Sequence, residues 1–150
     1  MGIIQKNKQG LFNYDLLETY QAGIALTGPE VKSVKKGQIS LKGSYVGIDG
    51  KGEVWLKNCH ISPYEPAKNI QKTYNPTQDR KLLLNKKEIK SLIGKLSQKG
   101  LTIVPISVYT KKGLIKLDIG LARGKTKLDK RESIKKRETD REIRRSLKRS

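Results

Sequence analysis

The sequence predicts a mainly β fold: a small closed or partly open antiparallel barrel with two or three helices, followed by a basic C-terminal tail. Three observations support this fold class. Segments rich in strand-forming residues alternate with turn signals from residue 14 to residue 122. Helix start signals occur at two places in that range. The last 28 residues hold 13 of the 33 lysines and arginines, so we divide the chain into a barrel (1–122) and a tail (123–150).

The barrel is predicted to begin with a long strand and a short helix. Residues 14–26 are rich in strand formers, and Gly23 is a candidate bulge or bend within them. Thr27–Glu30 has the pattern of a helix N-terminus, with threonine as the cap, proline in the first turn and glutamate three residues after the cap. We expect this helix to end at Gly37.

A hairpin is expected next. Residues 39–48 and 53–56 both have strand-forming composition, and Asp49-Gly50 between them is a strong hairpin-turn signal. Proline then recurs along the chain and predicts a loop-rich stretch, at Pro63, Pro66 and Pro76.

A second helix and a second hairpin complete the predicted barrel. The helix starts at Asn85, with Glu88 in the capping-box position, and runs to about Gln98. Its apolar residues have the spacing of one buried stripe: Ile89, Leu92, Ile93 and Leu96. Residues 101–109 and 114–122 are predicted strands, and the alternation of apolar and polar residues in the second predicts one wet face.

The charge predicts a polyanionic partner. The net charge is +19, and seven of the eight arginines lie in the tail. Arginine presents a planar fork of donors to phosphates, so these arginines indicate a contact segment. Opposite charges in the tail are three or four residues apart, as in a helix, but its apolar residues form no stripe. We therefore expect a tail that is disordered alone and helical on a polyanion.

Several classes of protein are disfavoured. A membrane-surface helix would need an apolar face with large side chains, which the tail lacks. No apolar run approaches the ~18–20 residues of a membrane span, and the first residues lack the apolar core of a secretory signal. A single cysteine suits a reducing compartment, so we expect a soluble cytoplasmic protein.

The sequence also offers little catalytic chemistry. Cys59 and His60 are adjacent, and on a strand they would point to opposite faces, which separates a nucleophile from its base. One cysteine and one histidine do not make a metal site. We therefore expect no enzyme activity, no metal and no cofactor.

RNA is the favoured partner. The sequence lacks helix-turn-helix and zinc-finger patterns, which argues against sequence-specific reading of DNA. A ribosomal protein and a generic polyanion binder remain alternatives. Five tyrosines have rings that can stack on bases, although each is more often a packing residue: Tyr14, Tyr45, Tyr64, Tyr74 and Tyr109.

Five short strings together resemble one protein family. They are Ala22–Ser33 (AGIALTGPEVKS), His60–Tyr64 (HISPY), Arg80–Leu84 (RKLLL), Leu121–Lys125 (LARGK) and Asp129–Glu132 (DKRE). In this order and spacing they resemble the SsrA-binding protein (small protein B) family, from about Asn7 to Arg145.

The resemblance implies a fold and a function. Members have an oligonucleotide-binding-type barrel and bind the tRNA-like domain of transfer-messenger RNA (tmRNA, or SsrA RNA). They bring this RNA to bacterial ribosomes stalled on an mRNA without a stop codon, for rescue and peptide tagging. The implied partners are tmRNA, alanyl-tmRNA with elongation factor Tu, and the decoding centre of the small ribosomal subunit. The tail is implied to become helical in the empty mRNA channel, and the protein to act as a monomer without a membrane.

The resemblance also assigns site residues. The implied tmRNA contacts are Asn7, Lys8, Tyr14, Leu83, Arg123, Gly124 and Lys125, although a leucine at position 83 fits a core position equally well. The implied ribosome contacts of the tail are Leu128, Asp129, Lys130, Arg131, Lys135, Lys136, Arg137 and Arg141. Three residues depart from the family pattern: Gln21 replaces glutamate, Thr126 replaces a basic residue, and Leu128 replaces an aromatic residue or histidine able to stack on a base.

Overall fold

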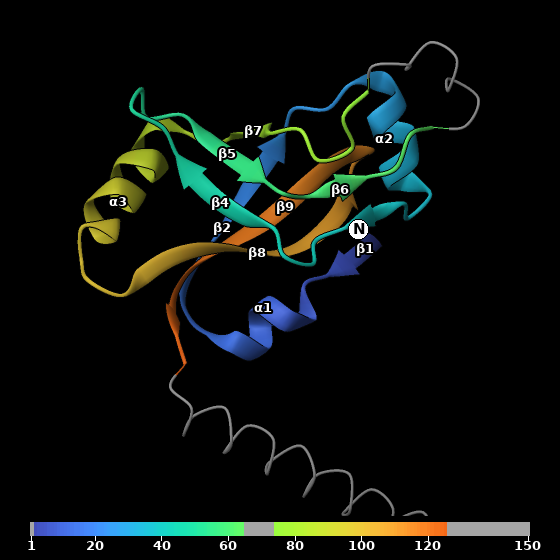
Figure 1. Ribbon diagram of the computed structural model, residues 1–150. Coiled ribbons are helices and arrows are strands. Elements are labelled where there is room, and N and C mark those ends of the chain that lie inside the picture. The colour runs from blue at the N-terminus through green and yellow to red at the C-terminus, as the bar shows by residue number, and fades with distance from the viewer. Residues whose placement is uncertain (1, 65–73, 126–150) are drawn as a thin grey trace, which may run out of the picture.

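A computed structural model describes residues 2–64 and 74–125, which form a curled antiparallel sheet with three helices around it (Figure 1). The helices are α1 (Lys8–Asn13), α2 (Gly28–Lys35) and α3 (Lys86–Leu96). The strands are β1 (Gly2–Lys6), β2 (Tyr14–Ile24), β3 (Ile39–Ser40), β4 (Tyr45–Ile48), β5 (Val54–Lys57), β6 (His60–Ile61), β7 (Arg80–Leu83), β8 (Leu101–Lys111) and β9 (Leu114–Gly124).

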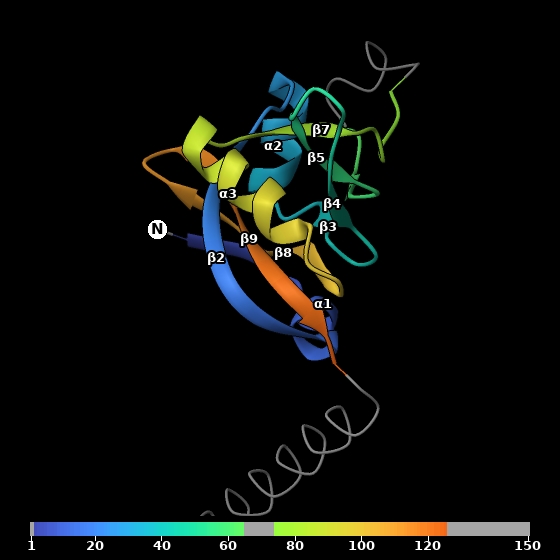
Figure 2. The same ribbon diagram turned by 90° about the vertical axis from the view of Figure 1, so that its left-hand side faces the viewer.

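The main sheet has the strand order β1-β8-β9-β2-β7-β5-β4, and β3 pairs with β6 apart from it. The edge strand β4 also packs against β8, so the sheet curls back on itself into a partly closed barrel. Figure 2 shows the long strands β2 and β9 curving side by side. The largest fully buried side chains fill the inside of this curl: Leu41, Leu56, Ile61, Leu92, Ile103, Leu117 and Ile119. The predicted mainly β fold with few helices is confirmed.

Both predicted helix starts are confirmed in detail. Thr27 caps α2, where its hydroxyl accepts from the Glu30 N–H while the Glu30 carboxylate accepts from the Thr27 N–H. Asn85 and Glu88 repeat this reciprocal pair at α3. The predicted end of the first helix is also confirmed, since Gly37 follows α2 with φ of +79°, a left-handed conformation that glycine adopts without strain.

The C-terminal hairpin is confirmed with wider bounds. β8 and β9 pair from Leu101 with Arg123 to Lys111 with Leu114. Lys112 and Gly113 between them both have positive φ, as a two-residue turn of this kind requires. The prediction that one face of β9 is exposed to water is only partly correct. Gly120, which belongs to that face, is buried against the side chains of Leu16 and Ile106.

The first hairpin differs from the prediction. The expected strand 39–48 is two strands, β3 and β4, with a turn between them. β4 and β5 do form a hairpin, but its loop is longer than Asp49-Gly50 and its left-handed residue is Gly52. The carboxylate of Asp49 accepts from the N–H groups of Lys51 and Glu53, so this side chain organises the whole loop.

Two further expectations are corrected, and two elements were not predicted. The bulge of β2 lies between Leu16 and Glu18, and Gly23 instead pairs in register. In α3, Leu92 is buried but Ile93 is 46% exposed, so the apolar stripe is narrower than its spacing predicted. β1 and α1 were not predicted, because their residues carry only weak strand and helix signals.

A buried ion pair ties α2 to β7. The guanidinium of Arg80 contacts a carboxylate oxygen of Glu30 at 2.6 Å from Nη2 and 2.7 Å from Nε, with both side chains 2% exposed or less. Arg80 also donates to the carbonyls of Cys59, Gln78 and Pro76, and to the hydroxyl of Tyr74. Every donor direction of this buried cation is thereby used. In the sequence, Arg80 stood out only as part of the string Arg80–Leu84, and this role was not predicted.

None of the helices in the described ranges has the length and apolar character needed to cross a membrane.

Candidate nucleic-acid interface

Most of the residues implied as RNA contacts in the barrel meet at one end of the sheet. Tyr14, at the start of β2, pairs with Gly124 at the end of β9, and Asp15 pairs with Arg123. The Lys125 N–H donates to the carbonyl of Asn13, the last residue of α1, at 3.0 Å. Residues more than 100 positions apart are therefore neighbours. We call this region the α1 end.

The division expected after Ala122 falls inside a strand. β9 continues through Arg123 and Gly124, which are both exposed. The Lys125 ammonium lies 5.9 Å from the centre of the Phe12 ring of α1, a cation–π contact. The start of the predicted tail is thus held against α1 by the sheet and by this contact.

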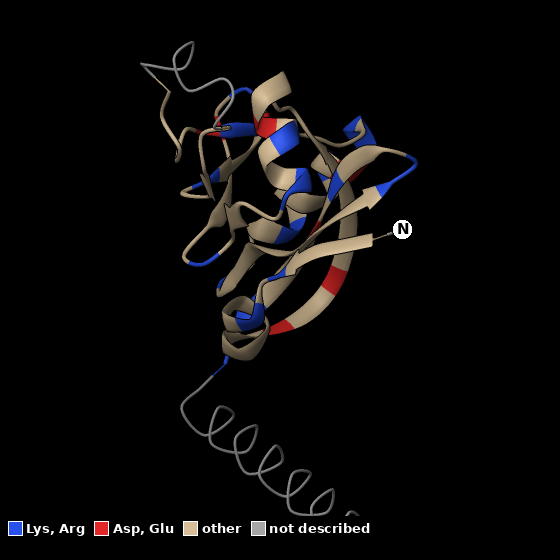
Figure 3. Ribbon diagram, turned by 90° about the vertical axis from the view of Figure 1, so that its right-hand side faces the viewer, with Lys and Arg blue, Asp and Glu red and all other residues tan. Residues whose placement is uncertain are grey.

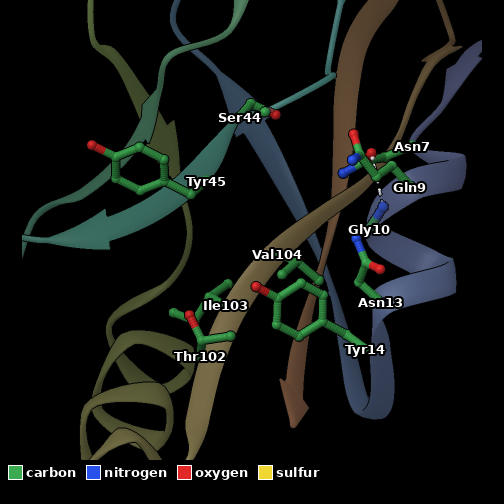
Figure 4. Close-up of a pocket in the computed structure, with 11 residues that line it drawn as sticks. Asn7, Gln9, Gly10, Asn13, Tyr14, Ser44, Tyr45, Thr102, Ile103 and Val104 are labelled. Atoms are coloured by element: carbon green, nitrogen blue, oxygen red, sulfur yellow. Dashed lines mark hydrogen bonds between the residues drawn. The ribbon is translucent and has the colours of Figure 1, made fainter. Parts of the chain in front are cut away.

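A pocket of about 330 Å³ opens beside α1 (Figure 4). Tyr45 projects from β4 on one side and Tyr14 lies on the other, with a short stretch of β8 between them. Tyr45 is 53% exposed and Tyr14 is half-buried, so both rings keep free surface. The pocket is lined by Asn7, Gln9, Gly10, Asn13, Tyr14, Gly43, Ser44, Tyr45, Thr102, Ile103 and Val104.

This pocket has the chemistry that recognises an unpaired nucleobase. Aromatic rings offer a stacking surface to any base. The side-chain amides of Gln9 and Asn13 offer both donors and acceptors to a base edge. Sequence analysis named Tyr45 among the tyrosines able to stack but missed Gln9 and Ser44, because nothing local marks a residue as lining a pocket between distant strands.

A second pocket adjoins the first and is basic. Its lining residues are Gln5, Lys6, Asn7, Lys8, Gln9, Ser40 and Lys42, so the two pockets share Asn7 and Gln9. The three lysines are all exposed. A base in the first pocket would therefore place its phosphate near ammonium groups in the second. Lys42 was not predicted as a contact residue. The predicted strand 39–48 covers residue 42, whereas in the structure Lys42 lies on a turn between β3 and β4.

Asn7 is a buried residue that fixes the position of α1 beside these pockets. It is 7% exposed, and its amide group donates to the carbonyl of Pro105 at 2.8 Å and accepts from the Gly10 N–H at 3.2 Å. Its own N–H donates to the carbonyl of Ile106 at 2.7 Å. Asn7 is thus the N-cap of α1 and its anchor to β8.

Asn7→Ala is expected to lower the free energy of unfolding by about 1–3 kcal/mol, because it removes the cap and leaves buried polar groups without partners. Urea unfolding followed by circular dichroism measures this change. Lys8→Ala is the matched control, because that side chain is exposed and its loss is expected to change stability by less than about 0.5 kcal/mol. An Asn7→Ala protein of unchanged stability would contradict the positioning role.

Leu83 lies away from the α1 end. It belongs to β7, whose Leu82 faces the core while Leu83 is 54% exposed, so the alternative of a core position for Leu83 is wrong. Its partner across the sheet is Gly23, nine residues along β2 from Tyr14. At about 3.3 Å per strand residue, the path along β2 from Gly23 to Tyr14 is roughly 30 Å. The structure therefore does not bring it together with the other predicted contacts.

Gln21, a departure from the family pattern, takes part in a short hydrogen-bonded chain. Its amide donates to the hydroxyl of Tyr109, which donates to a carboxylate oxygen of Asp118 at 2.8 Å. Burial raises the pKa of Tyr109, and the nearby Asp118 adds to this. A glutamate at position 21 would place a second carboxylate against the Tyr109 hydroxyl, which has only one proton to donate. The amide of Gln21 donates to this hydroxyl instead, so the hydroxyl proton stays available for Asp118.

The residues implied as ribosome contacts lie outside the described residues. They are Leu128, Asp129, Lys130, Arg131, Lys135, Lys136, Arg137 and Arg141, and Thr126 lies there as well.

The chain matches the family model described as SmpB protein over residues 4–149. It is 51% identical over 146 residues to an SsrA-binding protein of Sulfurihydrogenibium sp. (strain YO3AOP1), covering 97% of this chain and 94% of the relative. It is 50% identical over 146 residues to an SsrA-binding protein of Streptococcus mutans, covering 97% and 92%.

A solved structure also resembles it. The chain matches one from "tmRNA-SmpB: a journey to the center of the bacterial ribosome" with a TM-score of 0.60 and 43% identity. The match covers 82% of this chain and 88% of that one. The family model, the relatives and the structure all name the family that the five strings resemble. The chain therefore belongs to the SmpB family of SsrA-binding proteins.

Proposed function

We propose that this protein is an RNA-binding factor of trans-translation. It binds the tRNA-like domain of tmRNA and brings that RNA to stalled ribosomes, where peptide tagging follows. The observation that carries this proposal is the pair of adjoining pockets at the α1 end, one with two tyrosines and side-chain amides, the other with three lysines. Family membership specifies which RNA these pockets receive.

The two pockets bind different parts of the RNA, the first a base and the second the phosphates. The rings of Tyr14 and Tyr45 stack on a base, and the amides of Gln9 and Asn13 bond to its edge. Lys6, Lys8 and Lys42 neutralise phosphates of the same strand.

The remaining implied contacts take two other places. Arg123, Gly124 and Lys125 extend the α1-end surface along the end of β9. Leu83 offers an exposed apolar contact further along the barrel.

The tail serves the ribosome in this proposal. The barrel, residues 1–122, carries the tmRNA together with Arg123, Gly124 and Lys125 at the start of the tail. The tail beyond Lys125 reaches the decoding centre and the mRNA channel of the small subunit. The tail's arginines supply the phosphate contacts, and it becomes helical there. The protein acts as a monomer in the cytoplasm and works beside alanyl-tmRNA with elongation factor Tu.

Replacing Tyr14 or Tyr45 with alanine is expected to weaken binding of the tRNA-like domain by roughly 5- to 150-fold, because each loses about 1–3 kcal/mol of base stacking. Fluorescence anisotropy at about 150 mM salt with excess elongator tRNA as competitor measures this change. Tyr14→Phe and Tyr45→Phe are the matched controls, since they keep the ring and should retain most of the affinity.

The competitor separates specific from general binding. Wild-type binding that survives elongator tRNA supports the proposed receptor. Binding that ordinary tRNA erases, or alanine variants that bind as well as the wild type, would show that charge alone holds the RNA.

A further inference from the structure

The strands β1 and β3 are joined by a side chain. They belong to different sheets, because β1 is the edge strand of the main sheet and β3 pairs with β6. Backbone groups of successive strand residues point to opposite sides. Since Ser40 pairs with His60 of β6, the backbone groups of Ile39 and Leu41 point away from β6 and toward β1.

The side chain of Gln5 supplies partners for these groups. Its Nε2 donates to the carbonyl of Ile39 at 2.8 Å, and its Oε1 accepts from the N–H of Leu41 at 2.6 Å. A neighbouring strand would offer the same donor and acceptor, so the Gln5 amide takes the place of a backbone pairing. Ile39 and Leu41 are 4% and 1% exposed, so their backbone groups need such partners.

The bridged segment leads directly into the turn between β3 and β4. We call residues 41–44 the β3–β4 turn. The carbonyl of Leu41 accepts from the N–H of Ser44 at 3.0 Å and from its hydroxyl at 2.5 Å. Leu41 is therefore held through its N–H by Gln5 and through its carbonyl by Ser44, which ties the turn to β1.

The β3–β4 turn forms one wall of both pockets at the α1 end. Lys42 lines the basic pocket, and Ser44 lines the pocket with the tyrosines, where Figure 4 shows Ser44 and Tyr45 across from α1. Lys6 and Lys8 belong to the opposite wall. Figure 3 shows these basic residues where β1, which starts at the N label, passes into α1.

We propose that Gln5 is a positioning residue for RNA binding. It sets the distance between the two walls, so that Lys42 on one wall and the lysines of the other reach phosphates of the same strand. Gln5 itself lines the basic pocket, between the walls that its amide joins. The inference rests on the proposed function and requires no contact between Gln5 and the RNA.

A role in stability alone would have a different consequence. Two hydrogen bonds between half-buried groups contribute to folding wherever they lie. Removing them would then lower the melting temperature without changing the phosphate contacts of the protein that remains folded. In a positioning role, the loss of Gln5 instead has the same effect on RNA binding as the loss of Lys42.

The test is a double-mutant cycle on the full-length protein. Gln5→Met keeps the length of the side chain and removes both hydrogen bonds without changing the charge, and Lys42→Ala removes the lysine. Fluorescence anisotropy gives the affinity for the tRNA-like domain of tmRNA at several salt concentrations, below the melting temperature of every variant. Each single variant is expected to bind about 5-fold more weakly and to lower the salt slope by about 0.7–0.9, the value of one phosphate contact.

The double variant decides between the two roles. Gln5→Met together with Lys42→Ala should bind within about twofold of either single variant, because both remove the same contact. Losses that add in this cycle, or an unchanged salt slope in a folded Gln5→Met protein, would overturn the inference.

Two further variants are controls. Lys8 lies on α1, outside the turn that Gln5 holds, so the losses from Lys8→Ala and Gln5→Met should add. Gln78 is half-buried like Gln5, and its amide donates to the carboxylate of Glu30 at 3.3 Å. Gln78→Met should therefore leave RNA affinity and the salt slope unchanged. A loss from Gln78→Met equal to that from Gln5→Met would contradict the positioning role.

Hydrogen exchange of the free protein tests the bridge without RNA. The N–H of Leu41 should exchange about 5-fold faster or more in Gln5→Met than in the wild type, while the N–H groups of β8 and β9 keep their rates. A wild-type Leu41 N–H that exchanges as fast as one in an unstructured peptide would overturn the inference, even if Gln5→Met failed to fold.

These measurements keep the two proposals apart. Failure of the wild type to bind the tRNA-like domain contradicts the proposed function, and hydrogen exchange then still tests whether Gln5 holds the β3–β4 turn. Wild-type binding that Gln5→Met leaves unchanged in affinity and salt slope contradicts the positioning role alone.

Discussion

A protein that ends at Lys127 is expected to bind the tRNA-like domain of tmRNA within about threefold of the wild-type affinity and to lose peptide tagging on stalled ribosomes. The pockets that we propose for tmRNA are formed by residues 5–14, 40–45 and 102–104, so this truncation leaves them intact. It removes the ten basic residues that follow Lys127.

Two assays on the same protein measure this separation. Anisotropy gives the affinity for the tRNA-like domain, and a translation reaction on an mRNA without a stop codon gives the yield of tagged peptide. A full-length control with residues 128–150 in scrambled order keeps the net charge and composition. It is expected to bind RNA normally and to tag poorly, because helical contacts depend on spacing. Tagging that persists after truncation would contradict the division between barrel and tail.

Arg80→Met is expected to destabilise the fold by about 3–5 kcal/mol, because it leaves the carboxylate of Glu30 buried without a counter-charge. It also removes donors from the carbonyls of Cys59, Gln78 and Pro76. The double variant Arg80→Met, Glu30→Leu is expected to regain part of this loss, since no unpaired charge then remains. Urea unfolding measures each free energy.

The exposed pair of Lys57 and Asp79 supplies a matched control. Their separation is 3.5 Å and both side chains are over one-third exposed, so Lys57→Met should cost less than about 1 kcal/mol. A loss at Arg80 no larger than that at Lys57 would show that the buried pair does little for stability.

The same pair predicts a dependence of stability on acid. Burial raises the pKa of Glu30, but the hydrogen bond from the Thr27 N–H and the guanidinium of Arg80 outweigh this and hold it below its ordinary value of 4.5. The unfolded chain therefore binds a proton at this site more readily than the folded one. The contribution of Glu30 is present above pH 4.5 and declines as the pH falls toward the lower folded pKa. Glu30→Gln should flatten the decline in unfolding free energy over this range.

Local rules made several elements predictable. The N-terminal caps of α2 and α3 depend on residues three positions apart, and the end of α2 depends on one glycine. These helix ends could therefore be predicted from short segments of sequence. The hairpin of β8 and β9 was equally clear, because its strands are adjacent in the chain. The family resemblance likewise rested on short strings and was confirmed over residues 4–149.

The missed features depend on residues far apart in the chain. β1 is a strand because β8, about 100 residues later, offers it unpaired backbone groups. Gly23 has no bulge because Leu83 and Lys116 pair with it from two other strands. Ile93 follows the helical spacing of a core residue, yet the core ends before it and leaves it exposed.

The sequence by itself determined the charge, the helix caps, the C-terminal hairpin and the family, because composition and short-range hydrogen bonds need no knowledge of distant residues. Only the tertiary structure decided which side chains meet. It joined Tyr14, Tyr45 and the amides of α1 into one pocket, set Leu83 apart from them, and paired Glu30 with Arg80. The physical reason is that packing the barrel core fixes how the strands register and curl, and that arrangement places the side chains on its surface.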